Sequence, residues 1–258
     1  MKNMTPEQRK ELFPDNMVLL GYRGSIAHNM YVPNTDPNSI DDIDLMGVYM
    51  APVDHYIGLK RTRETIEKFI DQWDVVCYEY KNFVKLLLNS NPNVLSLLWI
   101  KDNYYIEKHD YGKILIENRD LFVSKKVYHS FTGYAHGQLK RMTHLSTEGY
   151  MGEKRKALVE KYGYDCKNAA HCIRLLKMGI EFLTEGSLNV FREDASWLLE
   201  IKRGLWKLED VKKESDRLFA LADEAYVRSS LPSKPEYDKV NDLLKSVLYN
   251  YINIQTKK

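Results

Sequence analysis

Three aspartates are the residues whose type and spacing most clearly suggest chemistry. Two of them, Asp42 and Asp44, lie two residues apart in the apolar segment 42–48. Residues i and i+2 of a strand point to the same face, so we expect these two carboxylates to project together. Like charges at that separation repel each other, and the pattern therefore indicates a bound cation. Oxygen ligands alone favour a hard ion, Mg²⁺ or Mn²⁺.

The third aspartate is Asp74, inside a strand predicted over residues 73–78. A lone acid in such an apolar run is costly to bury unless it is paired or bound to metal. Asp71 and Glu79 are the alternatives, although Glu79 better suits the start of a helix over residues 79–88. Asp41 should point to the opposite face of its strand, away from the predicted metal site.

A glycine-serine pair follows the first apolar run of the chain. Gly24 and Ser25 lie between a strand predicted over residues 17–21 and a helix predicted over residues 25–30. Glycine permits close approach, and backbone N–H groups at the start of a helix favour a phosphate. A plain N-cap serine is the alternative, but the downstream aspartate pair favours a role in binding a nucleotide phosphate.

One helix carries a stripe of cation-capable side chains. Apolar residues at three- and four-residue steps predict a helix over residues 165–184, and Lys167, His171 and Arg174 lie on its second face. This stripe suggests an anionic partner such as a nucleotide triphosphate. On these residues alone, a solvated face with a histidine at the edge of the core is the preferred interpretation. His28 is expected on a helix surface near the site and not as a catalytic base.

Together these motifs resemble the active-site pattern of the DNA polymerase β-like nucleotidyltransferase superfamily. The chain looks closest to the RNA-repair-associated nucleotidyltransferase family of bacteria and phages. Besides the glycine-serine pair and the aspartate pair, the resemblance rests on segments 74–79, 91–95, 161–165 and 171–176, and it spans about residues 21–204.

The resemblance implies a metal-dependent transfer of a nucleoside monophosphate from an NTP, most readily ATP or CTP, with Mg²⁺ (or Mn²⁺). Asp42, Asp44 and Asp74 would be the catalytic metal ligands. The residues implied to bind the nucleotide are Gly24, Ser25, Lys167, His171 and Arg174.

Composition and length are those of a globular protein. The chain has 258 residues, of which 44% are hydrophobic and 29% charged, and its net charge is +2. These values exclude a disordered chain and a strongly basic nucleic-acid binder. Three cysteines without zinc spacing, and no apolar signal region or membrane-length run, predict a cytoplasmic protein with no membrane partner.

We therefore predict an α+β fold in two domains. A polymerase β-like nucleotidyltransferase domain, a mixed sheet with flanking helices, would occupy residues 1–123. A helical domain that binds substrate or nucleotide would occupy residues 124–258, with helices over residues 131–145, 197–206, 208–225 and 237–252. The segment 33–39 has the composition of a surface loop, and a helix with Thr5 as N-cap is expected over residues 5–13.

The acceptor stays open at this level. An RNA 3′ end, tRNA among the candidates, is favoured by the resemblance alone. Nucleotidylation (AMPylation-type) of a protein or small molecule is favoured by the near-neutral charge, since RNA binding needs clustered Lys and Arg. An inactive nucleotide-binding scaffold is disfavoured by the complete carboxylate set. The sequence leaves the NTP, template dependence and oligomeric state undetermined.

Overall fold

The computed structural model describes residues 4–33, 35–36, 39, 41–143 and 153–257. The chain forms two compact units. The first comprises Met1–Ala27, Asp42–Val123 and Lys234–Lys258, and the second comprises His28–Asp41 and Ser124–Ser233. The main division thus falls at Val123, where the sequence changes to long helical patterns. The assignment of catalysis to residues 1–123 and of substrate binding to residues 124–258 stays a prediction.

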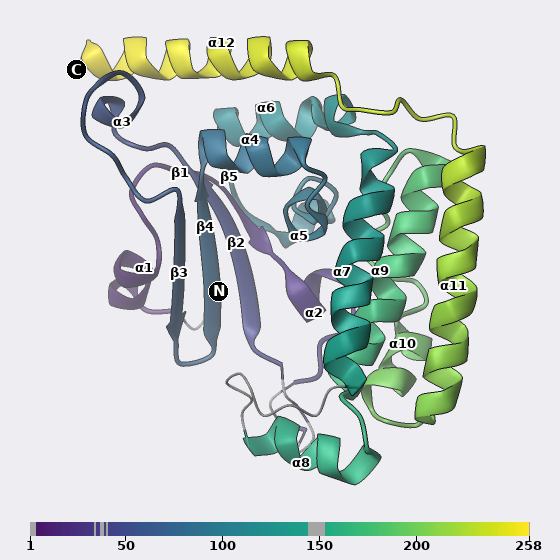
Figure 1. Cartoon of the computed structure of the whole chain (residues 1–258). Helices are drawn as coiled ribbons and strands as arrows, with labels where there is room; N and C mark the ends of the chain where they lie inside the picture. Colours follow the sequence, from purple (N-terminus) through teal and green to yellow (C-terminus); the bar gives the residue numbers. More distant parts are fainter. Residues whose placement is uncertain (1–3, 34, 37–38, 40, 144–152, 258) are drawn as a thin grey trace. The chain divides into compact units, whose positions relative to one another are not determined.

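A mixed sheet forms the centre of the first unit (Figure 1). Within the described residues its five strands lie in the order β3-β4-β2-β1-β5. The central pair β2 and β4 is parallel, and the other neighbours are antiparallel. The strands are β1 (Met17–Tyr22), β2 (Ile43–Tyr49), β3 (Thr65–Ile70), β4 (Trp73–Glu79) and β5 (Tyr105–Lys108).

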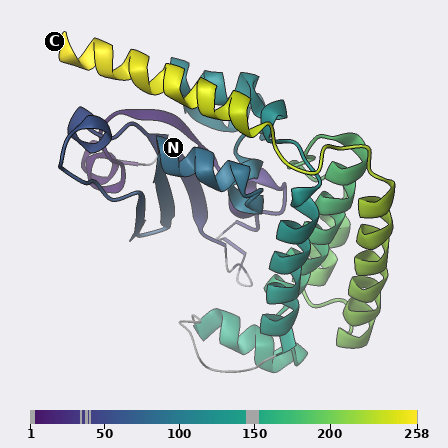
Figure 2. The ribbon, with the colours of Figure 1, turned by 45° about the horizontal axis from the view of Figure 1, so that its top comes forward.

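Short helices surround this sheet, and the last helix of the chain joins them. Thr5 and Gln8 form a capping box that starts α1, as predicted for Thr5. The C-terminal α12 runs beside α4 (Figures 1 and 2). The helices are α1 (Pro6–Leu12), α2 (Gly24–Ala27), α3 (Val53–Ile57), α4 (Tyr80–Leu88), α5 (Pro92–Ser96), α6 (Asp110–Glu117) and α12 (Tyr237–Thr256), with the 3₁₀ turns η1 (Asp102–Tyr104) and η2 (Arg119–Phe122).

The alternation of side chains along β2 and β4 separates the core from the acidic residues. Leu45 of β2 and Val75 of β4 belong to a buried cluster that includes Leu12 of α1. Successive strand residues point to opposite faces. Asp44 and Asp74, one position earlier on each strand, therefore project from the face opposite this cluster.

The second unit is a helical bundle around α9. This helix contacts α7, α8, α10 and α11, and Figure 1 shows α7, α9 and α11 side by side. Asp165 caps its N-terminus by accepting from the Asn168 N–H, and Gly186 ends it with a φ of 70°. The helices are α7 (Lys126–Thr143), α8 (Glu153–Tyr162), α9 (Cys166–Glu185), α10 (Ala195–Lys202) and α11 (Leu208–Arg228).

The α+β fold class is confirmed, as are the helices predicted at α1, α4, α9, α11 and α12. The helix predicted over residues 25–30 is shorter, because His28 and Asn29 form a turn in which Asn29 has a φ of 59°. β3, β5, α6 and α8 were not predicted, because their segments are short or highly charged. Residues 34, 37 and 38 of the predicted loop, and 144–145 of the helix predicted over 131–145, lie outside the described residues.

The three cysteines, Cys77, Cys166 and Cys172, are buried free thiols. Burial raises the pKa of Cys77 to about 12, so this thiol stays protonated at neutral pH. In the described parts of the chain, no helix has the length and apolar character needed to cross a membrane.

Close packing of α6 against β1 gives a stability prediction. A Cβ added at Gly112 would lie 2.2 Å from the Val18 carbonyl oxygen, whereas one at Gly133 of α7 would meet no atom within 4 Å. Gly112→Ala should lower the free energy of unfolding by about 1–3 kcal/mol through overpacking. Gly133→Ala should raise it by up to about 1 kcal/mol. Urea unfolding followed by circular dichroism measures both, and equal stabilisation would contradict the packing.

Candidate active site

Two carboxylates lie side by side where β2 and β4 run parallel. Asp44 and Asp74 are direct register partners on the two strands. Their side chains are partly exposed, with accessible fractions of 22% and 42%. The strand pairing thus brings together two of the three aspartates predicted from the sequence, although they are 30 residues apart in the chain.

An arginine that the sequence analysis did not single out bridges this pair. The Arg23 Nη2 lies 3.0 Å from the Asp74 Oδ2 and 3.6 Å from the Asp44 Oδ1. Its Nε donates to the Leu45 carbonyl oxygen at 3.2 Å, and its backbone N–H donates to the Asp44 carbonyl oxygen at 3.0 Å. A basic residue directly before the glycine-serine pair was the sequence signal for this contact.

Gly24 touches the same carboxylate from the next position. It has a φ of 60°, a conformation that residues with a Cβ rarely adopt. A Cβ built there would lie 2.0 Å from the Asp44 Oδ2. The turn after β1 therefore needs glycine for two reasons, its backbone conformation and its contact with the Asp44 side chain.

Ser25 adds a hydroxyl to this turn. Its Oγ is buried and has no hydrogen-bond partner among the described residues. An unpaired buried hydroxyl is costly and suggests a partner outside the protein chain. Because α2 has only four residues, the Ser25 hydroxyl itself, and not a helix dipole, is the main polar feature here.

The other acids considered from the sequence do not join Asp44 and Asp74 in the described structure. Asp42 lies one residue before β2, so strand alternation does not orient its side chain. Within the described residues, no three His, Cys, Asp or Glu side chains are grouped so that they could hold a metal ion. Glu79 is the N-cap of α4, as expected, and Asp71 accepts from Gln8 Nε2 at 2.7 Å.

A family of known proteins matches the part of the chain that contains the Gly24 turn, β2 and β4. The model of the RNA repair pathway DNA polymerase beta family (RlaP) matches residues 24–246. This chain belongs to that family. The resemblance stated from the motifs is therefore confirmed, and the fold is that of a polymerase β-like nucleotidyltransferase.

Two further proteins are similar to this family member. An uncharacterised protein of Methanocaldococcus jannaschii is 23% identical over 253 residues, which cover 93% of this chain and 98% of the relative. The solved structure of a nucleotidyltransferase-like protein from Exiguobacterium sibiricum shares 12% identity with a TM-score of 0.31, covering 84% of this chain and 71% of that one.

The second unit of this nucleotidyltransferase family member holds a buried arginine. Arg174 of α9 is only 8% exposed, and its Nη1 contacts the His28 Nε2 at 2.6 Å and the Met178 Sδ at 3.2 Å. The described residues place no carboxylate within ion-pair distance of Arg174. Burial, with a contribution from Arg192, lowers the pKa of its guanidinium to about 9. The predicted surface position of His28 is wrong, because this histidine is buried against Arg174 and the Val190 carbonyl.

The other two residues of the predicted stripe lie on the same helix. The Nε2 of His171 is buried without a hydrogen-bond partner among the described residues. Burial lowers its pKa well below the usual range, and Arg174 and Lys167 lower it further. Lys167 lies 3.7 Å from Asp41, which is buried, pairs with Lys202 and accepts from the Val32 N–H. Asp41 is thus held inside the second unit by these contacts and does not lie on β2, the strand on which it was expected.

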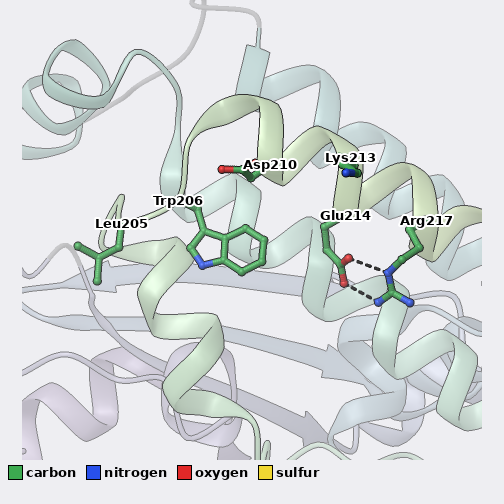
Figure 3. A pocket seen from close by; sticks show the side chains of 6 residues that line it. All are labelled: Leu205, Trp206, Asp210, Lys213, Glu214 and Arg217. Carbon is green, nitrogen blue, oxygen red and sulfur yellow. Dashed lines mark hydrogen bonds and ion pairs between the residues drawn. The ribbon is translucent and has the colours of Figure 1, made fainter.

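A cavity elsewhere in the second unit is not lined by any of these residues. It measures about 530 Å³ and lies where the chain enters α11 (Figure 3). Arg217 on its rim is held by Glu214 through two contacts of 2.7 Å. The lining residues are Leu205, Trp206, Asp210, Lys213, Glu214 and Arg217.

Because His28 is buried in its neutral form, we expect the folded protein to be less stable in acid. Its Nδ1–H donates to Val190 and its Nε2 accepts from Arg174, so protonation would set two donors against each other. Burial, then the charge of Arg174, lowers the pKa of His28 well below 6.5. The unfolded chain binds this proton below about pH 6.5, so His28 alone should cost about 1.4 kcal/mol of unfolding free energy between pH 7.5 and 5.5.

Urea unfolding at both pH values measures this loss. His28→Asn should show the smaller loss, by about the same 1.4 kcal/mol. His109→Asn, at a side chain that is 62% exposed, is the matched control and should keep the wild-type loss. Identical losses in all three proteins would contradict a neutral buried His28.

Proposed function

We propose that this protein transfers a nucleoside monophosphate from an NTP, with ATP or CTP as the first candidates, to the hydroxyl of an RNA 3′ end. The hydroxyl oxygen bonds to the α-phosphorus, and the bond from that phosphorus to the departing pyrophosphate breaks. The in-register pair Asp44 and Asp74 beside the Gly24 turn carries this proposal. The family's description as an RNA repair pathway supports an RNA acceptor.

The donor set fits a hard divalent cation. Asp44 and Asp74 present carboxylate oxygens only, side by side and partly open to solvent. We propose that these two hold Mg²⁺ (or Mn²⁺), an ion that one or two carboxylates and several waters can bind. Asp42, which is not grouped with them in the described structure, would join them as a third ligand only once the ion is bound. When bound, the cation would lower the pKa of the attacking hydroxyl and neutralise charge on the triphosphate.

Asp74, Ser25 and Gly24 have further roles in the proposed reaction. Asp74, the more exposed carboxylate, takes up the proton of the attacking hydroxyl. The Ser25 hydroxyl donates to a phosphate oxygen, which supplies the partner that its buried Oγ lacks within the described chain. Gly24, whose missing Cβ leaves room for the Asp44 carboxylate, would bind a phosphate oxygen through its backbone N–H.

The second unit supplies an anion site. Arg174 is a buried cation whose contacts are a neutral histidine and a thioether, and the His171 Nε2 has no partner in the described chain. An uncompensated buried guanidinium is costly, and a phosphate would compensate it. We propose that Lys167, His171 and Arg174 bind phosphates of the nucleotide.

Label transfer identifies the acceptor. The purified protein is incubated with Mg²⁺ or Mn²⁺, total RNA and each α-³²P-labelled NTP in turn. Label is expected on RNA with one or two of the NTPs and should disappear when the RNA 3′ diol is first oxidised with periodate. Label on protein that survives nuclease would instead establish protein nucleotidylation. No label with any NTP would support an inactive scaffold and overturn the proposal.

Substitution of the carboxylates tests their roles. Asp44→Asn and Asp74→Asn should each reduce the transfer rate about a thousandfold or more, equivalent to about 4 kcal/mol of transition-state stabilisation. Asp42→Asn should do the same if it is the third ligand. Asp71→Asn is the matched control: Asp71 has a φ of 55°, which asparagine also tolerates, and the activity should be unchanged. Wild-type turnover in Asp44→Asn would end the assignment.

Tripolyphosphate binding tests the anion site without catalysis. The ligand should raise the melting temperature of the wild-type protein, because binding to the folded state alone stabilises it. Arg174→Met should fold, since replacing a buried charge by an apolar side chain of similar size is often neutral or stabilising, but should lose the shift. Arg217→Met, which removes an arginine already paired with Glu214, should keep it. An undiminished shift in Arg174→Met would exclude Arg174 as a phosphate ligand.

A further inference from the structure

The guanidinium of Arg23 lies at the carboxylate oxygens that the proposed cation would use. It is within 3.0 Å of an Asp74 oxygen and 3.6 Å of an Asp44 oxygen. These two acids are direct neighbours on parallel strands, so their charges repel each other throughout the folded state. Arg23 offsets that repulsion with a full positive charge.

Arg23 reaches this position from a firmly attached backbone. Its N–H bonds to the Asp44 carbonyl, and the adjacent Tyr22 is the register partner of Leu45. Its side chain is 25% exposed, so the guanidinium borders solvent. The backbone can therefore stay in place while the side chain turns away from the two carboxylates.

Two cations at the same oxygens repel each other. A divalent ion bonded directly to Asp44 and Asp74 would meet the Arg23 guanidinium at ion-pair distance and be repelled by it. Cation binding and the Arg23 ion pairs therefore oppose each other.

We propose that Arg23 is the internal counter-ion of Asp44 and Asp74, and that it leaves both carboxylates when a divalent cation binds. Arg23 thus offsets one of the pair's two negative charges in the free protein and lowers its affinity for free metal ions. This inference rests on the proposed cation site at Asp44 and Asp74. It adds to that proposal a residue that controls when the site accepts a cation.

Mn²⁺ titration followed by electron paramagnetic resonance tests the competition without any reaction. Arg23→Gln removes the charge but keeps a donor for the Leu45 carbonyl, and it should bind Mn²⁺ about tenfold more tightly than wild type or better. Arg23→Met is a second charge-free variant. Arg23→Lys keeps the charge and should bind within about threefold of wild type. Asp44→Asn added to Arg23→Gln should abolish the gain.

The outcomes separate this inference from the proposed function. If wild type and the charge-free variants bind Mn²⁺ equally, and Asp44→Asn weakens all of them, the cation site stands and the role of Arg23 is wrong. If Asp44→Asn changes Mn²⁺ binding in no background, the cation site itself is wrong, and this inference fails with it.

The wild-type protein provides a second measurement that needs no folded Arg23 variant. The Arg23 Nε–H bonds to the Leu45 carbonyl, so its ¹⁵N–¹H resonance reports the position of the side chain. Saturating Mg²⁺ should shift this resonance in wild type but not in Asp44→Asn. A resonance that does not move while Mg²⁺ binds would show that Arg23 stays in place and would overturn the proposal.

Discussion

Repulsion between Asp44 and Asp74 is the constraint around which the first unit is built. Parallel pairing of β2 and β4 puts the two carboxylates at the same level of the sheet, and no change of side-chain rotamer removes them from each other's field. Such a pair is stable only beside a positive charge. Arg23 provides that charge, and its distances to both acids show that it serves them together.

This electrostatic requirement also explains the turn that follows β1. The Arg23 N–H continues the bonding between β1 and β2, which fixes the chain directly over Asp44. The next residue must then pass within contact of the Asp44 carboxylate in a left-handed conformation, and only glycine satisfies both conditions. The position of Asp44 therefore explains why residue 24 is glycine. Ser25, as the next residue, lies in the same turn.

Interactions between residues close in sequence could be predicted, and those between distant segments could not. Helices such as α9 were predictable because their caps and apolar spacing are local, and the aspartates stood out because acids are rare in apolar strands. The pairing of Asp44 with Asp74 needed the parallel register, which local patterns do not contain. The contact of Arg23 with both acids and the burial of His28 depend on segments brought together by the fold. Arg23 was therefore not singled out from the sequence, and His28 was wrongly predicted at the surface.

The net charge of the chain does not show where its charged side chains lie. A net charge of +2 argues against a strongly basic nucleic-acid surface, yet Arg174 is buried with a neutral histidine as its nearest polar partner. His28 keeps that partnership only in the tautomer that donates to Val190, since a protonated ring would oppose the guanidinium. The second unit thus preserves an uncompensated positive charge in its interior, a costly arrangement that an anionic ligand would relieve. Total charge therefore does not decide whether a protein attracts phosphate, because local burial and the placement of charge set the strength of that attraction.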